Sequence, residues 1–318
     1  MTGVPVNLPS EPGILGFIQR SQELAPDEVW EGDAEHQRTV YDRLCAALRH
    51  PRPEGITVTD MAFDLPERTI AVRCYRPPGD VPHPALIYLH GGGWVVGDLD
   101  SHDDICAELA AEGAVAVFAV DYRLCPEHPY PAALNDGLDV LARLRAGAKT
   151  HDIDATRIML AGDSAGGNLC AAMALKLRDG AGPQVQAMAL VYPGLGGDMS
   201  KGSFVEQANA PFLTTASIHH YLALYTGGKP VASDPYCMPL AASFYDGLPS
   251  AFITAAHFDP LRDDASLFAQ RLDKAGVPVE LRIEPQLVHG WLRARHDSDG
   301  ARAAFDALCR AISKFAQR

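Results

Sequence analysis

Residues 158–172 read IMLAGDSAGGNLCAA, an apolar run that leads through a glycine-framed serine into a row of small residues. The apolar run is typical of a buried strand, and the small residues favour a helix. Between them, residues 162–166 (GDSAG) match the pattern G-x-S-x-G, whose glycines permit the tight turn that exposes a serine hydroxyl. We therefore predict that Ser164 is a nucleophile at the start of a helix, where the helix dipole favours developing negative charge.

Apolar runs on both sides of this segment predict the other strands of one sheet. With 158–161 included, the eight runs lie at residues 56–63, 69–75, 85–89, 115–120, 158–161, 187–192, 251–256 and 279–283. Helical patterns lie between most of them, at residues 103–112, 132–145, 167–178, 214–225, 263–274 and 301–315. This alternation predicts an α/β fold with a mostly parallel, eight-stranded sheet flanked by helices, whose first two strands form an antiparallel edge.

We expect one domain over residues 1–318, with a helical cap over one end of the sheet. Two helical patterns precede the first strand, and the segment 193–249 holds one helix and no clear strand. An irregular segment of that length is unusual in a compact domain unless it forms a lid. The predicted cap therefore comprises about residues 1–50 and about residues 194–248.

Composition argues against several classes of partner and cofactor. The formal net charge of -13 repels phosphate backbones, so we expect no nucleic acid partner. The seven cysteines are scattered without a CxxC pair, which predicts neither a disulfide framework nor a zinc site but reduced thiols in a cytoplasmic protein. The N-terminus lacks a signal-peptide pattern, and no run approaches the roughly 18 apolar residues of a membrane span. We expect no cofactor and no metal, and a homodimer stays open.

A second glycine-rich motif, HGGGW at residues 90–94, directly follows the predicted strand at 85–89. Three consecutive glycines allow the backbone to fold back so that several N–H groups converge on one point. A tetrahedral oxyanion needs such preorganised donors. We therefore predict an oxyanion hole made by the backbone N–H groups of Gly92 and Gly93, with that of Ala165 from the serine turn.

Phosphate-binding loops are the alternative interpretation of these glycines. The pattern G-x-G-x-x-G fails because Val96 stands at the last glycine position, and Gly228-Lys229 is followed by Pro230 instead of Ser or Thr. For His90 we favour a structural role in holding the loop over a role as a base.

A serine nucleophile needs a base and an acid that orients it. Asp259 directly follows the seventh predicted strand, and His289 lies on a loop after the eighth. Both thus lie beyond the carboxyl ends of strands, where open α/β sheets place their sites. We predict that Ser164, Asp259 and His289 form a catalytic triad. Asp263 and Asp264 are the competing acids, but carboxylates there are better placed to begin the next helix; helix capping is the alternative role for Asp259.

Five motifs together resemble the hormone-sensitive lipase family of the α/β-hydrolase superfamily, known in bacteria as family IV esterases. They are HGGGW at 90–94, DYRLCPEH at 121–128, GDSAGGN at 162–168, DPLRD at 259–263 and HGW at 289–291, and the resemblance covers about residues 70–295. It implies the α/β-hydrolase fold, the same triad and the same oxyanion hole. It also implies a buried polar network of Asp121, Arg123 and Glu127 beside the active site.

The resemblance implies a serine carboxylesterase that hydrolyses short- to medium-chain esters through an acyl-enzyme intermediate, without a cofactor. Trp94, Trp291, Phe212 and Leu213 are candidate substrate-binding residues, with packing inside the cap as the alternative for the last two; Trp291 stands where the family usually has Phe. An amidase or deacetylase with the same triad stays open. A non-catalytic ligand receptor on the same fold is disfavoured, because such receptors lack the histidine that His289 supplies.

Overall fold

An eight-stranded, mostly parallel sheet lies at the centre of the computed structural model, which describes residues 8–26, 30 and 32–318. In space the strand order is β1-β2-β4-β3-β5-β6-β7-β8, and β2 runs antiparallel to both of its neighbours. The strands are β1 (Thr57–Leu65), β2 (Arg68–Arg76), β3 (His83–Leu89), β4 (Ala116–Val120), β5 (Ile153–Asp163), β6 (Ala187–Val191), β7 (Ser250–Phe258) and β8 (Val279–Val288). The predicted α/β fold and its antiparallel first pair are confirmed.

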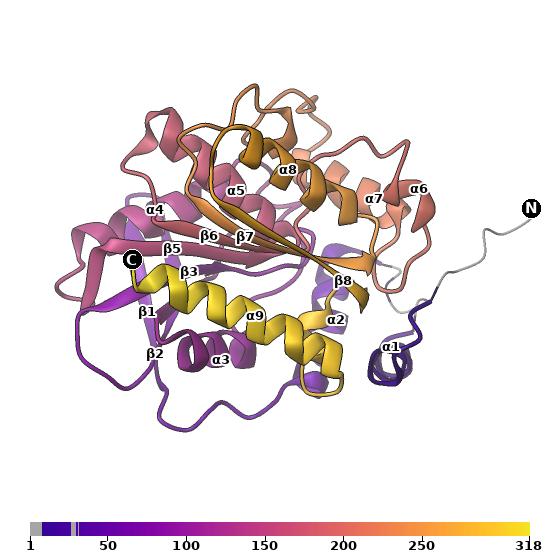
Figure 1. The fold of residues 1–318 in the computed structure, drawn as a ribbon, viewed down its shortest axis with the longest axis horizontal. Helices are drawn as coiled ribbons and strands as arrows, with labels where there is room; N and C mark the ends of the chain where they lie inside the picture. Colours follow the sequence, from indigo (N-terminus) through magenta and orange to yellow (C-terminus); the bar gives the residue numbers. More distant parts are fainter. Residues whose placement is uncertain (1–7, 27–29, 31) are drawn as a thin grey trace, which may run out of the picture.

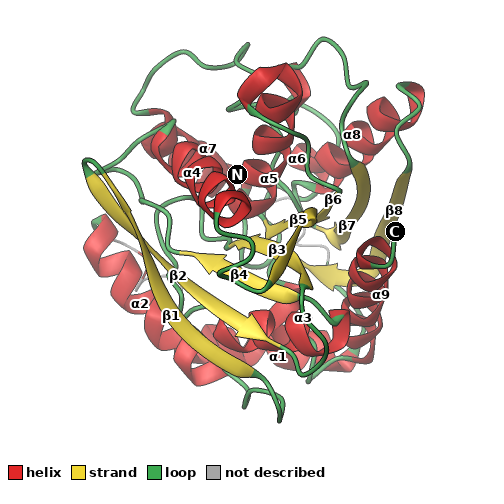
Figure 2. Ribbon diagram, turned by 90° about the vertical axis from the view of Figure 1, so that its left-hand side faces the viewer, coloured by secondary structure: helices red, strands yellow, loops and turns green. Residues whose placement is uncertain are grey.

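Helices cover both faces of the sheet (Figures 1 and 2). Apolar side chains of α4, α5 and α8 pack on one face, and those of α3 and α9 pack on the other, where α1 joins them. The helices are α1 (Pro12–Leu24), α2 (Ala34–Leu48), α3 (Asp103–Gly113), α4 (Ala132–Ala146), α5 (Ala165–Lys176), α6 (Ser203–Glu206), α7 (Thr215–Thr226), α8 (Arg262–Lys274) and α9 (Asp299–Ala316). Because both faces are covered, strands such as β4 are buried along their whole length, which explains their uninterrupted apolar sequence.

The long segment between β6 and β7 is tied to the helix that follows Ser164. The Asn168 side chain on α5 donates from Nδ2 to the carbonyl oxygens of Gly194 at 2.8 Å and Cys237 at 3.0 Å. One side chain therefore holds both ends of the part of this segment that carries α6 and α7. The segment also meets the N-terminal helices, since the Phe17 and Phe212 ring centroids lie 5.1 Å apart.

None of the described helices combines the length and apolar character that crossing a bilayer requires.

Candidate active site

Ser164 occupies the turn between β5 and α5, at the carboxyl edge of the sheet. Its φ of 53° and ψ of −116° are values that residues other than glycine rarely adopt. Glycines make the turn possible: a Cβ added to Gly166 would lie 1.8 Å from the Leu89 carbonyl oxygen. The Ser164 side chain is partly exposed, so the strained turn presents its hydroxyl at the surface of the sheet edge.

The three residues predicted as a triad meet in an unbroken chain of contacts. The Ser164 hydroxyl lies 2.9 Å from His289 Nε2, and His289 Nδ1 lies 2.7 Å from Asp259 Oδ2. Asp259 follows β7 and His289 follows β8, so two adjacent parallel strands deliver acid and base to the same edge. Asp259 is completely buried, and its second oxygen accepts the Leu261 N–H at 2.8 Å. With Nδ1 protonated, this histidine can accept a proton from the serine.

The competing carboxylates have other partners. Asp263 accepts the Ser203 N–H at 2.9 Å, and Asp264 accepts the Leu195 N–H at 2.6 Å. Both partners belong to the segment between β6 and β7, which Asp263 and Asp264 thus hold against α8. Burial raises the pKa of Asp264 to about 7, and the neighbouring charge of Asp259 acts in the same direction.

The HGGGW motif forms a loop whose donors are free for an external oxygen. Gly92 has φ +125° and Gly93 φ +59°, both left-handed values that suit glycine. The Gly92 carbonyl accepts the N–H groups of Val95 and Val96, each at 3.0 Å, which closes the loop. Within the described part of the chain, no acceptor takes the N–H of Gly92, Gly93 or Ala165. These three N–H groups therefore have no partner within the described residues, and their role as the donors of an oxyanion hole stays a prediction.

Helix α7 covers this loop. A Cβ added to Gly93 would lie 2.6 Å from the Tyr221 ring, so α7 packs directly on the glycine. Trp94 stacks on Tyr225 of the same helix, with ring centroids 4.1 Å apart. The HGGGW loop therefore contributes to the contact between the sheet and the segment that follows β6.

Sequence reasoning missed Asp163, the residue before the nucleophile. Its buried carboxylate accepts the Gly91 N–H at 2.9 Å and the Tyr88 hydroxyl at 2.8 Å, and it pairs with His102 at 3.4 Å. Burial opposes ionisation, but the charge and hydrogen bond of His102 and the hydrogen bond of Tyr88 outweigh it and lower the pKa of Asp163. Asp163 thus ties the HGGGW loop to the serine turn. An acidic residue at the end of an apolar strand was the available signal.

Tyr192 was also missed, although it follows a buried strand directly. Its ring centroid lies 4.6 Å from that of His289, and its hydroxyl donates to Asp163 at 3.4 Å. Its φ is 36°, a strained value that the contacts around the ring maintain. Tyr192 therefore supports one side of the histidine.

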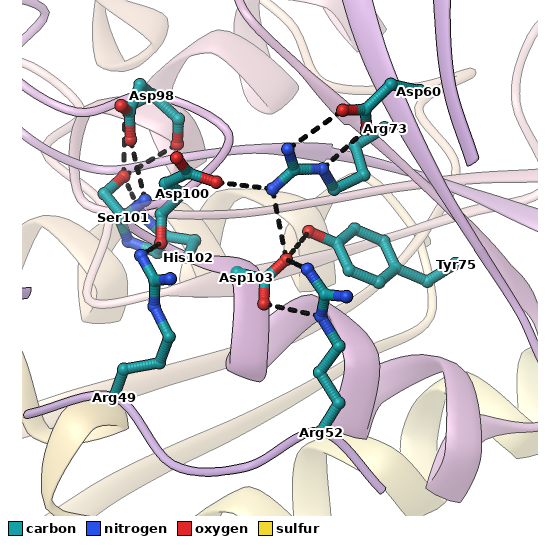
Figure 3. A network of polar contacts seen from close by, with 10 residues as sticks. All are labelled: Arg49, Arg52, Asp60, Arg73, Tyr75, Asp98, Asp100, Ser101, His102 and Asp103. Atoms are coloured by element: carbon teal, nitrogen blue, oxygen red, sulfur yellow. Dashed lines mark hydrogen bonds and ion pairs between the residues drawn. The ribbon is translucent and has the colours of Figure 1, made fainter. Parts of the chain in front are cut away.

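His102 belongs to a polar network that extends towards the surface (Figure 3). The Ser101 hydroxyl lies 3.0 Å from His102 Nδ1, on the side opposite Asp163. Next along the chain, Asp103 accepts hydrogen bonds from Arg52, Arg73 and Tyr75. These contacts fix the start of α3 and so hold His102 against the carboxylate behind Ser164.

His90 has the structural environment that we favoured. Its ring stacks on Tyr122 at 4.3 Å, and the Tyr122 hydroxyl donates to the His90 carbonyl at 2.6 Å. Burial lowers the pKa of His90 to about 4, with the nearby His102 acting in the same direction. A neutral, enclosed ring beneath the glycine loop supports the backbone there.

The buried network expected for Asp121, Arg123 and Glu127 is not present in the described structure. Asp121 and Glu127 are exposed, and Arg123 pairs with the buried Asp136 at 2.9 Å. The expectation is wrong because Arg123 pairs with Asp136 and Glu127 pairs with Arg38, so these side chains do not bind one another.

The candidate substrate-binding residues differ in their surroundings. Trp291 is completely buried against Tyr192 and the core beneath α9, so the expectation that it lines the substrate site is wrong. Leu213 is buried with Phe204 and Leu261 in a small cluster of its own, the packing role left open for it. Phe212 is 43% exposed, and for it and Trp94 substrate contact stays a prediction.

Metal ligands do not gather in the described residues: no three His, Cys, Asp or Glu side chains there could hold an ion together. The seven cysteines are all buried free thiols.

Comparisons with known proteins point to one family. A model of the α/β hydrolase fold matches residues 86–293. Carboxylesterase NlhH of Mycobacterium tuberculosis is 45% identical over 228 residues, covering 70% of this chain and 71% of that protein. Ethyl acetate hydrolase of Pseudomonas putida is 34% identical over 268 residues, 82% of this chain and 84% of that protein. The crystal structure of a thermostable esterase from Pseudomonas putida ECU1011 superposes with a TM-score of 0.92 at 26% identity, covering 100% of both chains.

Proposed function

Because the chain belongs to the α/β hydrolase fold family, among the hormone-sensitive lipase-like esterases, we propose that Ser164, His289 and Asp259 carry out its chemistry. The chain is a carboxylic ester hydrolase, since relatives at up to 45% identity are named esterases and carboxylesterases. The observation that supports the assignment of residues is the contact chain from Asp259 through His289 to Ser164, at 2.7 Å and 2.9 Å.

The reaction proceeds in two acyl-transfer steps. Ser164 Oγ attacks the ester carbonyl carbon while its proton passes to His289 Nε2, and Asp259 stabilises the imidazolium that forms. The tetrahedral intermediate collapses as His289 returns the proton to the departing alcohol, which leaves an acyl group on Ser164. His289 then takes a proton from water, and the resulting hydroxide attacks the acyl group and releases the acid.

The backbone donors of Gly92, Gly93 and Ala165 stabilise the negative oxygen in both steps. They are positioned before the substrate arrives, so the reaction does not have to reorganise them. The loop that carries two of these groups is held by Asp163 at one end and covered by α7 at the other.

The substrates are esters with short to medium acyl chains, because the cap brings bulky side chains to the oxyanion loop. Tyr221 packs on Gly93, and the contact between Phe17 and Phe212 joins the two cap segments, residues 1–50 and 194–248. These contacts support the proposal of a short acyl-binding site.

A fluorophosphonate probe tests the assignment of the nucleophile. It should label the parent protein on Ser164, and Ser164→Ala should lose both labelling and ester hydrolysis while its far-UV circular dichroism and Tm are kept. Labelling of a different serine would refute the assignment.

A further inference from the structure

The oxyanion loop has a cationic partner that the reaction scheme does not use. Arg38 lies on α2, in the N-terminal part of the chain, and its Nε donates to the Val95 carbonyl at 2.8 Å. Its Nη2 donates to the Cys125 carbonyl at 3.0 Å. Cys125 in turn donates its N–H to the Trp94 carbonyl at 2.8 Å. One guanidinium group thus joins two loop segments that already contact each other.

Two rigid peptide planes connect this contact to the predicted oxyanion hole. A peptide bond is planar, so the Val95 carbonyl and the Val96 N–H have a fixed relative orientation, pointing in opposite directions. The Val96 N–H donates to the Gly92 carbonyl at 3.0 Å. The Gly92 carbonyl shares its own peptide plane with the Gly93 N–H, which is left free for the oxyanion. Fixing the Val95 carbonyl therefore helps to fix the direction of the Gly93 donor.

We propose that Arg38 is a positioning residue for the oxyanion hole, acting on the Gly93 N–H through the Val95–Val96 and Gly92–Gly93 peptides. The inference rests on the proposed function of this loop. The positive charge also polarises the first carbonyl, and each hydrogen bond in such a series strengthens the next by about 10–30%. Arg38 therefore both orients and strengthens a donor that matters most in the transition state.

The ion pair that Arg38 makes with Glu127 is the competing explanation for its presence. Glu127 accepts from Nη1 at 2.9 Å and from Nη2 at 2.6 Å, but its side chain is 51% exposed. Exposed ion pairs contribute little to stability because water and salt screen them. The hydrogen bonds to the two carbonyls fix geometry in a way that the exposed pair does not, and the two roles can be separated by substitution.

The test compares Arg38→Met and Arg38→Lys with two controls. Glu127→Gln removes the ion pair and leaves the carbonyl contacts in place. Arg49→Met is the second control. Arg49 directly follows α2 and, like Arg38, donates to a backbone carbonyl, that of Asp100 at 2.6 Å (Figure 3). Asp100 lies in the same connection between β3 and α3 as Val95, but outside the Gly92–Val96 turn. For each variant, kcat and KM for p-nitrophenyl butyrate, the Tm, and the Ki of a trifluoromethyl ketone would be measured.

Removing an oxyanion donor outright lowers kcat about 10²- to 10³-fold. Arg38→Met misplaces one of three donors, so we expect kcat to fall about 10- to 100-fold with KM changed less than about threefold. The Ki of the ketone, which forms an oxyanion on Ser164, should rise by the same factor as kcat/KM falls. Arg38→Lys should lie between parent and Arg38→Met, because one ammonium group cannot span both carbonyls. Both controls should keep kcat within about threefold.

Three results would overturn the inference: unchanged kcat in Arg38→Met and Arg38→Lys, a loss in Glu127→Gln as large as in Arg38→Met, or a fall in kcat with the ketone Ki unchanged. Should Arg38→Met not fold, the Arg38→Lys and Glu127→Gln pair decides by the same criteria. The proposed function fails by a different result, the absence of fluorophosphonate labelling on Ser164 in the parent.

Discussion

Replacing Asp259 by Asn tests the catalytic acid sharply, because a neighbouring backbone group dictates how the new amide has to sit. One oxygen of the buried Asp259 accepts the Leu261 N–H at 2.8 Å, and the other faces His289 Nδ1 at 2.7 Å. A buried donor left without an acceptor costs about 1–3 kcal/mol. The amide oxygen in Asp259→Asn therefore keeps the Leu261 N–H, and the amide NH₂ turns towards His289.

An NH₂ group in that place donates a hydrogen bond, so His289 Nδ1 has to accept it and the ring proton moves to Nε2. Nε2 then cannot take the proton of Ser164. The same substitution in a protease triad lowers kcat about 10⁴-fold, which corresponds to about 5 kcal/mol of transition-state stabilisation. We expect a loss of this order in kcat for p-nitrophenyl butyrate, with little change in KM or in far-UV circular dichroism.

Asp263→Asn is the matched control, since Asp263 lies four residues further on, in the first turn of α8, and contacts Ser203 and Arg262 instead of the histidine. Its kcat should fall far less than that of Asp259→Asn. Equal losses, or a larger loss in Asp263→Asn, would refute the reasoning and point to the wrong carboxylate.

Three further expectations follow from the described contacts. Burial raises the pKa of Asp264 to about 7, whereas an unfolded chain titrates near 3.9. The stability that the protonated Asp264 contributes is therefore complete below about pH 4 and is lost as pH rises through about 7. The Tm of the parent should fall between about pH 5 and about pH 8, and the Tm of Asp264→Asn should change less over the same range. Parallel Tm curves for the two proteins would contradict this expectation. Gly93→Ala should lower kcat at least tenfold, because the added Cβ meets the Tyr221 ring at 2.6 Å. The double variant Gly93→Ala/Tyr221→Ala should recover part of this kcat. If it does not, the clash with Tyr221 is not the cause of the loss. Each buried CH₂ contributes about 0.8 kcal/mol, so kcat/KM should climb from acetyl to butyryl or hexanoyl esters and then fall, whereas a rise continuing to palmitoyl would show an open pocket.

Strand and motif positions were predictable because they depend on local sequence. The apolar run before Ser164 and the all-apolar β4 are buried on both faces, and glycines occur where the turn needs them. Strand ends were less predictable. β5 begins at Ile153, five residues before the apolar run, and β8 continues to Val288 through Pro285. β8 is an edge strand, where a missing N–H can face away from the sheet, so proline does not end it.

Side-chain partners between distant segments could not be predicted from periodicity. Asp163 holds Gly91, 72 residues earlier, and Arg38 reaches Val95 across 57 residues. Trp291 was misassigned because an aromatic residue two positions after the predicted base suggested a place near substrate. The short helical turn that begins at Trp291 instead directs its ring into the core under α9.

Asn168 anchors the part of the chain that carries α6 and α7, so that this part resembles a module that could be exchanged. The amide group of Asn168 binds this segment at two places by hydrogen bonds. One is at Gly194, where the segment leaves the sheet, and the other is at Cys237, before the chain returns to the sheet. Since Asn168 lies on the nucleophile's own helix, we expect changes of length or sequence in this segment that keep the contacts of α7 with Gly93 and Trp94 to leave Ser164 in place. Closing a loop twice as long costs only about 0.6 kcal/mol more. Grafting a different lid between Gly194 and Cys237 is thus a direct way to redesign which esters this scaffold accepts.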